Sequence, residues 1–163
     1  MENEGIIFIE VDDVLEGGKA RHKKLMEQFY RQYHFGKRKR IMDEGDTGTL
    51  ISGRRVRQLK DYSFLWDMDD YTDKHMKIIE CPRGLLSSVE DLSDSMMSQV
   101  ETCNGQIGWL GGNGRPDVAA GHSIIASKVK DRQPELVKLC NVCVKQAQSH
   151  SVKMKIWHIK PRE

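Results

Sequence analysis

The chain has 163 residues, of which 38% are hydrophobic and 31% charged, and its formal net charge is +2. This length suits one domain, and no stretch reads as a membrane span or a signal peptide. The four cysteines are therefore expected to be reduced, as in an intracellular protein. Charge is unevenly spread, with an acidic excess in residues 61–101 and basic excesses on both sides. These local basic excesses are compatible with a polyanionic partner.

The first predicted element is a β-hairpin over residues 5–15. Apolar residues flank the adjacent carboxylates Asp12 and Asp13, and two glycines follow the run. Buried acids are costly without partners, so this pair either faces water at a turn, which is common, or binds cations. A tight turn lets both acids approach one site, and Mg²⁺ takes carboxylate and phosphate oxygens as ligands.

A helix is expected over residues 19–33, with Leu25, Phe29 and Tyr33 along one apolar stripe and Met26 and Tyr30 beside them. The basic run that follows consists of Lys37, Arg38, Lys39 and Arg40. Such a run is typical of a solvated surface, and it also matches a phosphate contact or a nuclear localisation patch.

A strand over residues 49–58 carries the second basic segment, made of Arg54, Arg55 and Arg57. Two basic segments on successive elements favour nucleic-acid binding more than one does. The run 62–66 is predicted to pair with this strand as a hairpin. A helix over residues 67–79 follows, where the adjacent acids Asp69 and Asp70 favour N-terminal capping.

The second half of the chain is predicted to be mainly helical. Residues 84–98 are rich in serine and acids and predict a flexible linker. Cys140 and Cys143 match a CxxC spacing, but a zinc site needs further ligands, so small core residues are favoured. A helix is expected over residues 99–110, where small residues allow close packing. A second helix is expected from Arg115, with Pro116 in its first turn. A third is expected over residues 134–148, followed by a strand at 152–159.

The order of these motifs resembles the reverse transcriptases of copia-type retrotransposons. Glu10-Val11-Asp12-Asp13 resembles the Tyr-Val-Asp-Asp catalytic box of that family, and Ser52-Gly53-Arg54-Arg55-Val56 follows in the family's order. The most specific likeness is the segment 104–110 leading to Arg115-Pro116-Asp117-Val118-Ala119, which is similar to the family's small-residue helix and its Thr-Arg-Pro-Asp-Ile-Ala motif. The resemblance covers nearly the whole chain.

This resemblance implies an α+β fold: a partial polymerase palm hairpin plus helix, a β-hairpin, then a helical thumb and connection region. It divides the chain into four parts. Residues 1–60 are a partial palm with the acidic hairpin and basic strand, and residues 61–83 are a strand and helix. Residues 84–98 are a flexible linker, and residues 99–163 are the helical thumb and connection with its terminal strand.

The implied activity is RNA-directed DNA polymerisation. Asp12 and Asp13 would be the catalytic carboxylates that bind Mg²⁺, and the two basic segments would lie near the backbone of the RNA template and DNA primer. Arg115, Pro116 and Asp117 would hold a helix start together. The implied partners include the rest of the Pol polyprotein, namely an upstream palm and a downstream ribonuclease H domain. The implied location is the cytoplasm, in virus-like particles, with the nucleus as an alternative.

Two features depart from the family pattern. Glu10 replaces the usual tyrosine, and the family's third catalytic aspartate belongs before this hairpin, where the sequence offers none. We therefore expect a fragment that binds Mg²⁺ weakly and does not polymerise by itself. The alternatives are a non-catalytic nucleic-acid-binding or interaction fragment, and an unrelated small α+β scaffold.

Overall fold

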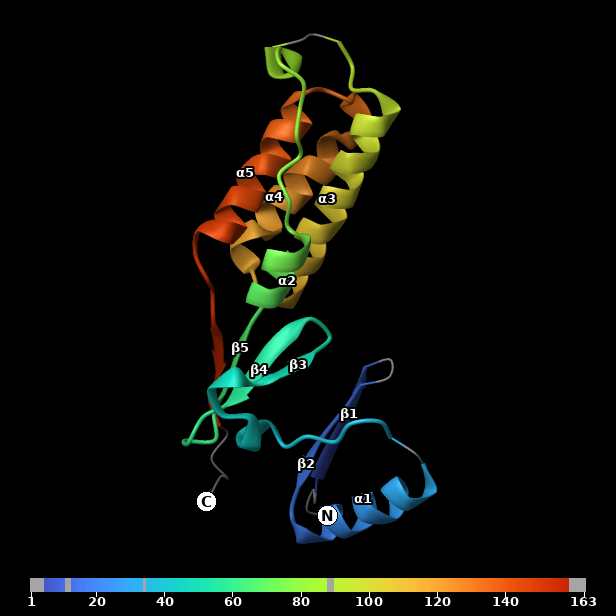
Figure 1. Ribbon diagram of the computed structural model, residues 1–163, viewed down its shortest axis with the longest axis vertical. Coiled ribbons are helices and arrows are strands. Elements are labelled where there is room, and N and C mark those ends of the chain that lie inside the picture. The colour runs from blue at the N-terminus through green and yellow to red at the C-terminus, as the bar shows by residue number, and fades with distance from the viewer. Residues whose placement is uncertain (1–4, 11–12, 34, 88–89, 159–163) are drawn as a thin grey trace.

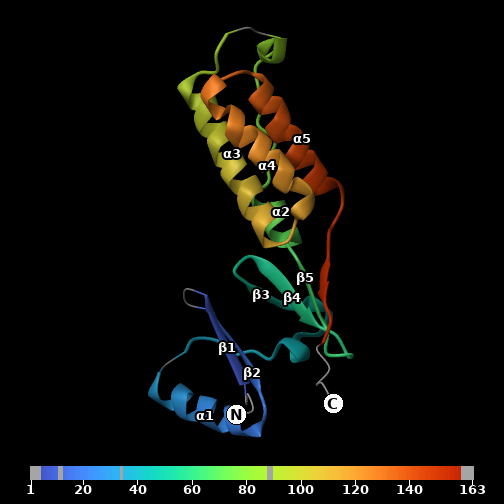
Figure 2. The ribbon, with the colours of Figure 1, turned by 180° about the vertical axis from the view of Figure 1, so that it is seen from behind.

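The computed structural model describes residues 5–10, 13–33, 35–87 and 90–158. Its elements form a β-rich half and a helical half, so the predicted α+β class is confirmed (Figure 1). The β-rich half contains a two-stranded hairpin with one helix and a separate sheet of four strands. The helical half is a bundle of α3, α4 and α5, seen from behind in Figure 2. No helix within the described ranges is long and apolar enough to cross a membrane.

The predicted acidic hairpin is confirmed. Strand β1 (Gly5–Glu10) pairs antiparallel with β2 (Asp13–Gly18), and the register sets Glu10 opposite Asp13. Two residues in the sequence, Val11 and Asp12, therefore separate the paired ends, which is the commonest connection in a β-hairpin.

Helix α1 (Ala20–Gln32) follows the hairpin, and only part of its predicted apolar face is buried. It packs on β2 through His22 and Met26, which are buried, whereas Leu25 and Tyr33 are each 56% exposed. The His22 ring lies 2.7 Å from the carboxylate of Glu16 on β2. The hairpin thus covers His22 and Met26 of α1 and leaves Leu25 and Tyr33 exposed.

The prediction of a single strand over residues 49–58 was also wrong. After the short helix η1 (Ile41–Thr47), the chain forms β3 (Thr49–Ile51) and β4 (Arg54–Gln58) as an antiparallel hairpin. Its two turn residues, Ser52 and Gly53, both have positive φ, of 46° and 78°, as the tightest hairpin turns require.

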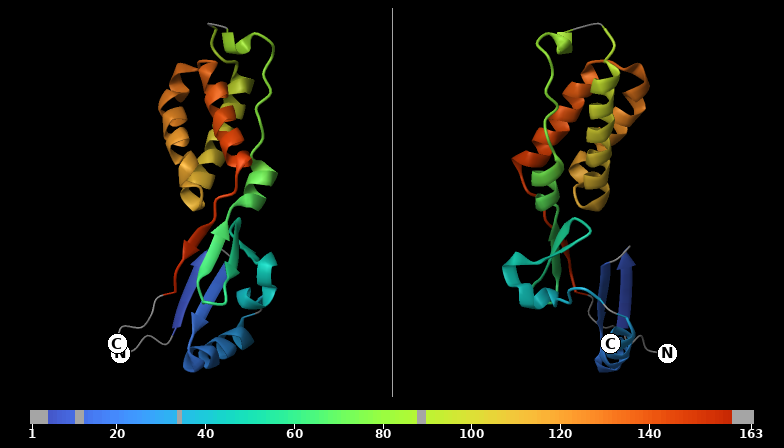
Figure 3. Two further views of the ribbon diagram at one scale, coloured as in Figure 1. Left: turned by 90° about the vertical axis from the view of Figure 1, so that its left-hand side faces the viewer. Right: turned by 45° about the vertical axis from the view of Figure 1, so that its right-hand side comes forward.

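The sheet is completed by strands from distant parts of the chain. Strand β5 (Phe64–Asp67) pairs antiparallel with β4, as predicted for the run 62–66. The terminal strand β6 (Met154–Ile156) pairs antiparallel with β5, which gives the order β3-β4-β5-β6. The left panel of Figure 3 shows β5 and β6 side by side below the bundle.

Helix α2 (Asp69–His75) is shorter than the predicted helix 67–79. After His75 the chain is extended along the bundle (Figure 1). There the Asn141 side chain accepts a hydrogen bond from the Ile79 N–H at 2.8 Å and donates one to its carbonyl at 2.9 Å. Because these bonds satisfy the backbone of a buried residue, the segment does not need a helix.

The segment 84–98 contains more structure than the predicted linker. It includes the short helix η2 (Leu85–Ser87), and Leu92 is 1% exposed and donates its N–H to the Arg132 carbonyl at 2.7 Å. Helix α3 (Asp94–Asn113) begins within the predicted linker, because the Ser93 side chain caps it by accepting the Met96 N–H. Residues 88–89 lie outside the described ranges.

The bundle core forms where α3 meets α4 (Pro116–Lys128) and α5 (Glu135–Ser149), with the short helix η3 (Val129–Asp131) between them. The small residues of α3 do allow close packing: a Cβ at Gly111 would lie 3.1 Å from the Cα of Ala119. Cys140 and Cys143 are buried core residues, as favoured from the sequence. The fully buried aliphatic residues of these helices are Val100, Ile107, Leu110, Val118, Ile125, Leu136, Val137 and Val144.

Candidate functional site

The acidic turn is the first candidate site. Asp13 begins β2, and its backbone faces Glu10 of β1. Asp12 and the side chain of Asp13, to which the predicted Mg²⁺ site was assigned, lie outside the described part of the structure. Among the described side chains, no group of three or more His, Cys, Asp or Glu gathers in a way that could hold a metal ion.

Arg55 and Arg57 on β4 form internal ion pairs. The Arg55 guanidinium donates two hydrogen bonds of 2.6 Å to the Asp70 carboxylate and a third to the Thr47 carbonyl. Arg57 pairs with Asp67, which is fully buried, and its Nε donates to the Asp46 carbonyl at 2.7 Å. These two side chains tie β4 to α2, β5 and η1, so much of their hydrogen-bonding capacity is used inside the fold.

Asp67 also performs the capping that the sequence assigned to the next acid pair. Its carboxylate lies 3.3 Å from the Asp69 N–H, at the start of α2. Asp69 instead accepts a hydrogen bond from the Ser151 hydroxyl, while Asp70 pairs with Arg55. The predicted capping by Asp69 and Asp70 was therefore wrong: both acids lie in the first turn of α2, and the Asp69 N–H is bonded by Asp67, two residues earlier.

Arg54 lies at a groove between the sheet and the bundle. Its guanidinium donates a hydrogen bond to the Asn113 side chain at the end of α3. The groove has a volume of about 360 Å³, and its lining includes Arg54, Trp66, Gly112, Asn113, Pro116 and Met154. Arg54 is thus the arginine of β4 whose charge borders an open concave surface.

The basic run 37–40 is exposed between α1 and η1. Its partners are local: Arg38 stacks 3.7 Å from the centre of the Tyr30 ring, Lys39 pairs with Glu44, and Arg40 lies 3.9 Å from Asp43. Exposed ion pairs of this kind are weak and exchange readily with other ligands. A phosphate backbone could therefore compete for these cations.

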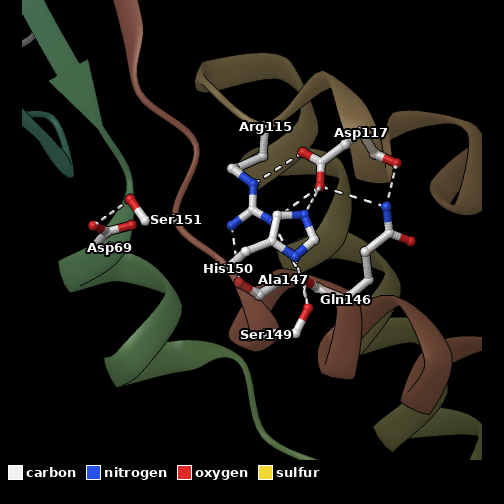
Figure 4. A network of polar contacts seen from close by, with 8 residues as sticks. All are labelled: Asp69, Arg115, Asp117, Gln146, Ala147, Ser149, His150 and Ser151. Carbon is white, nitrogen blue, oxygen red and sulfur yellow. Dashed lines mark hydrogen bonds and ion pairs between the residues drawn. The ribbon is translucent and has the colours of Figure 1, made fainter.

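The predicted helix start at Arg115-Pro116-Asp117 is confirmed as a structural motif. Arg115 is fully buried and donates two hydrogen bonds of 2.9 Å to the Asp117 carboxylate, in the first turn of α4. A third bond of 2.9 Å reaches the Ala147 carbonyl at the end of α5 (Figure 4). Gln146 donates to the Asp117 carbonyl. The motif thus joins the start of α4 to the end of α5.

The ion pair with Arg115 shifts the titration of Asp117. Hydrogen bonds from the guanidinium, together with its charge, lower the pKa of this carboxyl against the opposing effect of burial. The His150 ring lies 3.9 Å from the same carboxylate (Figure 4). The buried Arg115 and the partly buried Asp117 therefore face each other within the fold, with the exposed His150 ring beside them, which suits a structural role.

Sequence reasoning missed two polar contacts that shape the fold. Asn141 lies between Cys140 and Cys143, and its carboxamide bonds the backbone of Ile79. Asp67 stands at the start of the predicted helix 67–79, and it is a buried partner of Arg57. A polar residue within an otherwise apolar helix face was the available signal for Asn141. No local pattern marked Asp67.

No family model, curated protein or solved structure matches this chain. The geometry of the described residues and the motif order of the sequence are therefore the basis of the functional proposal.

The Arg55–Asp70 pair predicts a pH-dependent stability. Hydrogen bonds from Arg55 lower the pKa of Asp70 below 3.8, and burial opposes this. A depressed folded-state pKa stabilises the fold above the unfolded pKa, and that contribution is lost as pH falls through the folded pKa. Urea midpoints between pH 5 and pH 3 should fall less in Arg55→Gln than in the wild type. An equal fall in both proteins would contradict this assignment.

Proposed function

We propose that the chain carries the acidic hairpin, the basic strand and the helical region of an RNA-directed DNA polymerase of the copia retrotransposon type. The supporting observation is the β1–β2 hairpin, in which Glu10 at the end of β1 pairs with Asp13 at the start of β2, and Asp12 directly precedes Asp13 in the sequence. Two adjacent carboxylates at a hairpin turn suit Mg²⁺ bound together with nucleotide phosphates. The Arg-Pro-Asp start of α4 adds support, because it follows the hairpin in the same order as in that family.

In this proposal Asp12 and Asp13 contribute carboxylate oxygens to the catalytic Mg²⁺ ions, which would clamp the attacking and leaving oxygens of phosphoryl transfer. The family's third carboxylate would come from a palm segment that these 163 residues do not supply. We therefore expect weak Mg²⁺ binding and no synthesis by this chain alone.

Primer extension on an RNA template tests the assignment. The chain alone should give no Mg²⁺-dependent product. The chain combined with an upstream palm segment of a copia-type polymerase should extend the primer, and Asp13→Asn in that combination should abolish extension. Extension that survives Asp13→Asn would refute the proposed role of the hairpin. Extension by the isolated chain would refute the need for a further carboxylate.

The primer–template backbone would contact the exposed run 37–40 and Arg54. The run 37–40 is exposed and Arg54, which donates to the Asn113 side chain, lines the groove, whereas Arg55 and Arg57 form ion pairs with Asp70 and Asp67. This assignment narrows the set of seven basic residues predicted from the sequence. Arg55 and Arg57 would act mainly by holding β4 in place.

The second candidate is a non-catalytic nucleic-acid-binding fragment, and the exposed run 37–40 favours it. Fluorescence anisotropy with an RNA–DNA primer–template should show affinity that falls with salt. The double variant Lys37→Ala/Arg40→Ala should reduce the slope of log K against log salt by about 1 to 2, because each phosphate contact contributes about 0.7 to 0.9.

The control variant Lys138→Ala/Lys145→Ala removes two exposed cations from α5, and its slope should match the wild type. Asp12→Asn/Asp13→Asn distinguishes the two candidates. The non-catalytic candidate is supported if the affinity for primer–template in the presence of Mg²⁺ is the same in this variant as in the wild type, and if the wild type gives no extension after the palm segment is added. An unchanged slope in the Lys37 and Arg40 variant would exclude the run 37–40 as the contact.

A further inference from the structure

Helix α1 and the run 37–40 form a strongly basic part of the chain. Residues 19–40 contain nine lysines and arginines and a single acid, Glu27, although the whole chain has a net charge of only +2. The basic residues predicted from the sequence to contact nucleic acid include the run 37–40 and none of the cations of α1. Four exposed cations lie within this helix, namely Arg21, Lys23, Lys24 and Arg31.

Three of these cations share the side of α1 that faces away from the hairpin. Arg21, Lys24 and Arg31 follow one another at three and seven residues, which is the spacing of one helix face. At 3.6 residues per turn, all three lie about 140–160° round the helix from Met26, which the hairpin covers. We call this side the outer face of α1. Figures 1 and 3 place α1 at the end of the molecule away from the bundle.

The run 37–40 is held beside the same helix. The Arg38 guanidinium stacks on the ring of Tyr30 in α1, 3.7 Å from its centre. The ring of Phe35 packs edge-on against Tyr30, with 5.3 Å between the ring centres, and lies 5.5 Å from the ring of Phe29. The chain therefore folds back after α1, and the cations of the helix and of the run belong to one cationic surface.

The cations of the outer face are not used by the fold. Within the described ranges, the side chains of Arg21, Lys24 and Arg31 form no ion pair or hydrogen bond. The first turn of α1 has no acid and carries Arg21 and Lys23, although cations are unfavourable at the positive end of a helix dipole. Because these charges cost the helix stability and gain no internal partner, they indicate an external anion.

We propose that the outer face of α1 binds the phosphate backbone of a nucleic acid, next to the run 37–40. From Arg21 to Arg31 the face extends about 15 Å, which corresponds to about four phosphates along one strand of a duplex. This contact rests on the proposed function only through the run 37–40, and it adds Arg21, Lys24 and Arg31 to the residues that hold the nucleic acid.

The composition of the outer face selects a nucleic acid among the possible partners. The remaining residue of this side, Gln28, is polar, so the face has no apolar side chain to enter a bilayer, as interfacial helices require. A second copy of the face would bring like charges together. A palm segment that extends the β1–β2 sheet would lie on the hairpin side of α1, so it does not compete for the outer face.

Fluorescence anisotropy with an RNA–DNA primer–template tests the outer face. Lys24→Ala/Arg31→Ala should reduce the slope of log K against log salt by about 1 to 2, because each phosphate contact contributes about 0.7 to 0.9. Both side chains are exposed and alanine favours a helix, so the fold should be retained. The matched control on α5, Lys138→Ala/Lys145→Ala, should keep the wild-type slope. A wild-type slope in Lys24→Ala/Arg31→Ala would overturn the proposal.

The separate variant Lys37→Ala/Arg40→Ala distinguishes this contact from the proposed function. If it reduces the slope while Lys24→Ala/Arg31→Ala does not, the outer face is refuted and the contact through the run 37–40 stands. If only Lys24→Ala/Arg31→Ala reduces the slope, the outer face is supported and the role of the run is refuted. Primer extension with Asp13→Asn tests the polymerase assignment by itself, because that change alters neither basic segment.

Removing the acid of this segment should increase binding. Glu27 lies three residues after Lys24 and four before Arg31, so its charge opposes theirs on the same part of the helix. Glu27→Gln should therefore raise the affinity for primer–template about twofold at low salt. Glu101→Gln removes an exposed acid from α3 and should leave the affinity unchanged. Such a gain cannot come from misfolding, and unchanged or weaker binding in Glu27→Gln would contradict the proposal.

Lipid vesicles test the other source of anionic phosphates. Vesicles of phosphatidylcholine and phosphatidylserine offer negative charge, but stable binding of a helix to them also needs apolar insertion. At about 0.15 M salt, the wild-type chain should stay in the supernatant when the vesicles are sedimented. A wild-type chain that sediments with the vesicles, together with a Lys24→Ala/Arg31→Ala chain that does not, would assign the outer face to a membrane and overturn the proposal.

Discussion

Replacing Asp117 by alanine is expected to lower the free energy of unfolding by about 3–5 kcal/mol, because it leaves a buried charge without its partner. Arg115 is fully buried, and two of its hydrogen bonds go to this carboxylate. The remaining hydrogen bonds, to the carbonyls of Ala147 and Gln146, cannot neutralise the guanidinium. Urea denaturation followed by far-UV circular dichroism at pH 7 measures the loss.

The exposed pair of Lys128 and Glu135 provides the control. Both side chains are about half exposed and 3.1 Å apart, so Glu135→Gln should cost less than about 1 kcal/mol. Replacing both members of the buried pair, as Arg115→Met/Asp117→Leu, should cost less than Asp117→Ala alone, because no unpaired charge remains. A loss in Asp117→Ala no larger than in Glu135→Gln would show that the Arg115 network contributes little.

Replacing Gly108 by alanine is the second change with a large expected effect. An added Cβ would lie 2.6–3.0 Å from three atoms of the His122 ring on α4. The ring nitrogen Nδ1 is 3.0 Å from both the carbonyl and the side-chain oxygen of Asn104, so the ring cannot move without weakening these contacts. We expect a loss of about 1–3 kcal/mol from overpacking, measured by thermal or urea unfolding.

Gly105→Ala in the same helix is the matched control. No atom lies within 4 Å of a Cβ placed there, so this change should stabilise the helix by about 0.5–1 kcal/mol. Both variants make the same change in intrinsic helix preference, and their difference therefore measures the α3–α4 contact. Similar stabilities for the two variants would mean that the helices can separate at Gly108 at little cost.

The elements that local sequence determines were predicted well. Two acids between apolar runs gave the β1–β2 hairpin, and Pro116 gave the first turn of α4. The errors arose where a distant side chain decides the local structure. Glu16 on β2 contacts the buried His22 of α1, and Asn141 on α5 bonds the extended backbone at Ile79, where a helix was predicted. Sequence separation hides such contacts, because periodicity describes only neighbours along one element.

The candidate site shows the same division. The sequence located the arginines of β4, and their charge was a reasonable sign of nucleic-acid binding. Whether an arginine is available depends on acids that lie elsewhere, such as Asp70 for Arg55 and Asp67 for Arg57. The structure shows that Arg55 and Arg57 form ion pairs within the fold. It also shows that Arg54 lines the groove.

The pairing of β5 with β6 has a consequence for the order of folding. Phe64 and Ile156 are partners in this ladder, and all the bundle helices lie between them in the chain. Closing so long a loop costs conformational entropy that is recovered only when its ends are brought together. The bundle has mostly local contacts and can form first, which places its two ends near one another. We expect β6 to join the sheet as a late step, so that the four-stranded sheet is complete only after the bundle has folded.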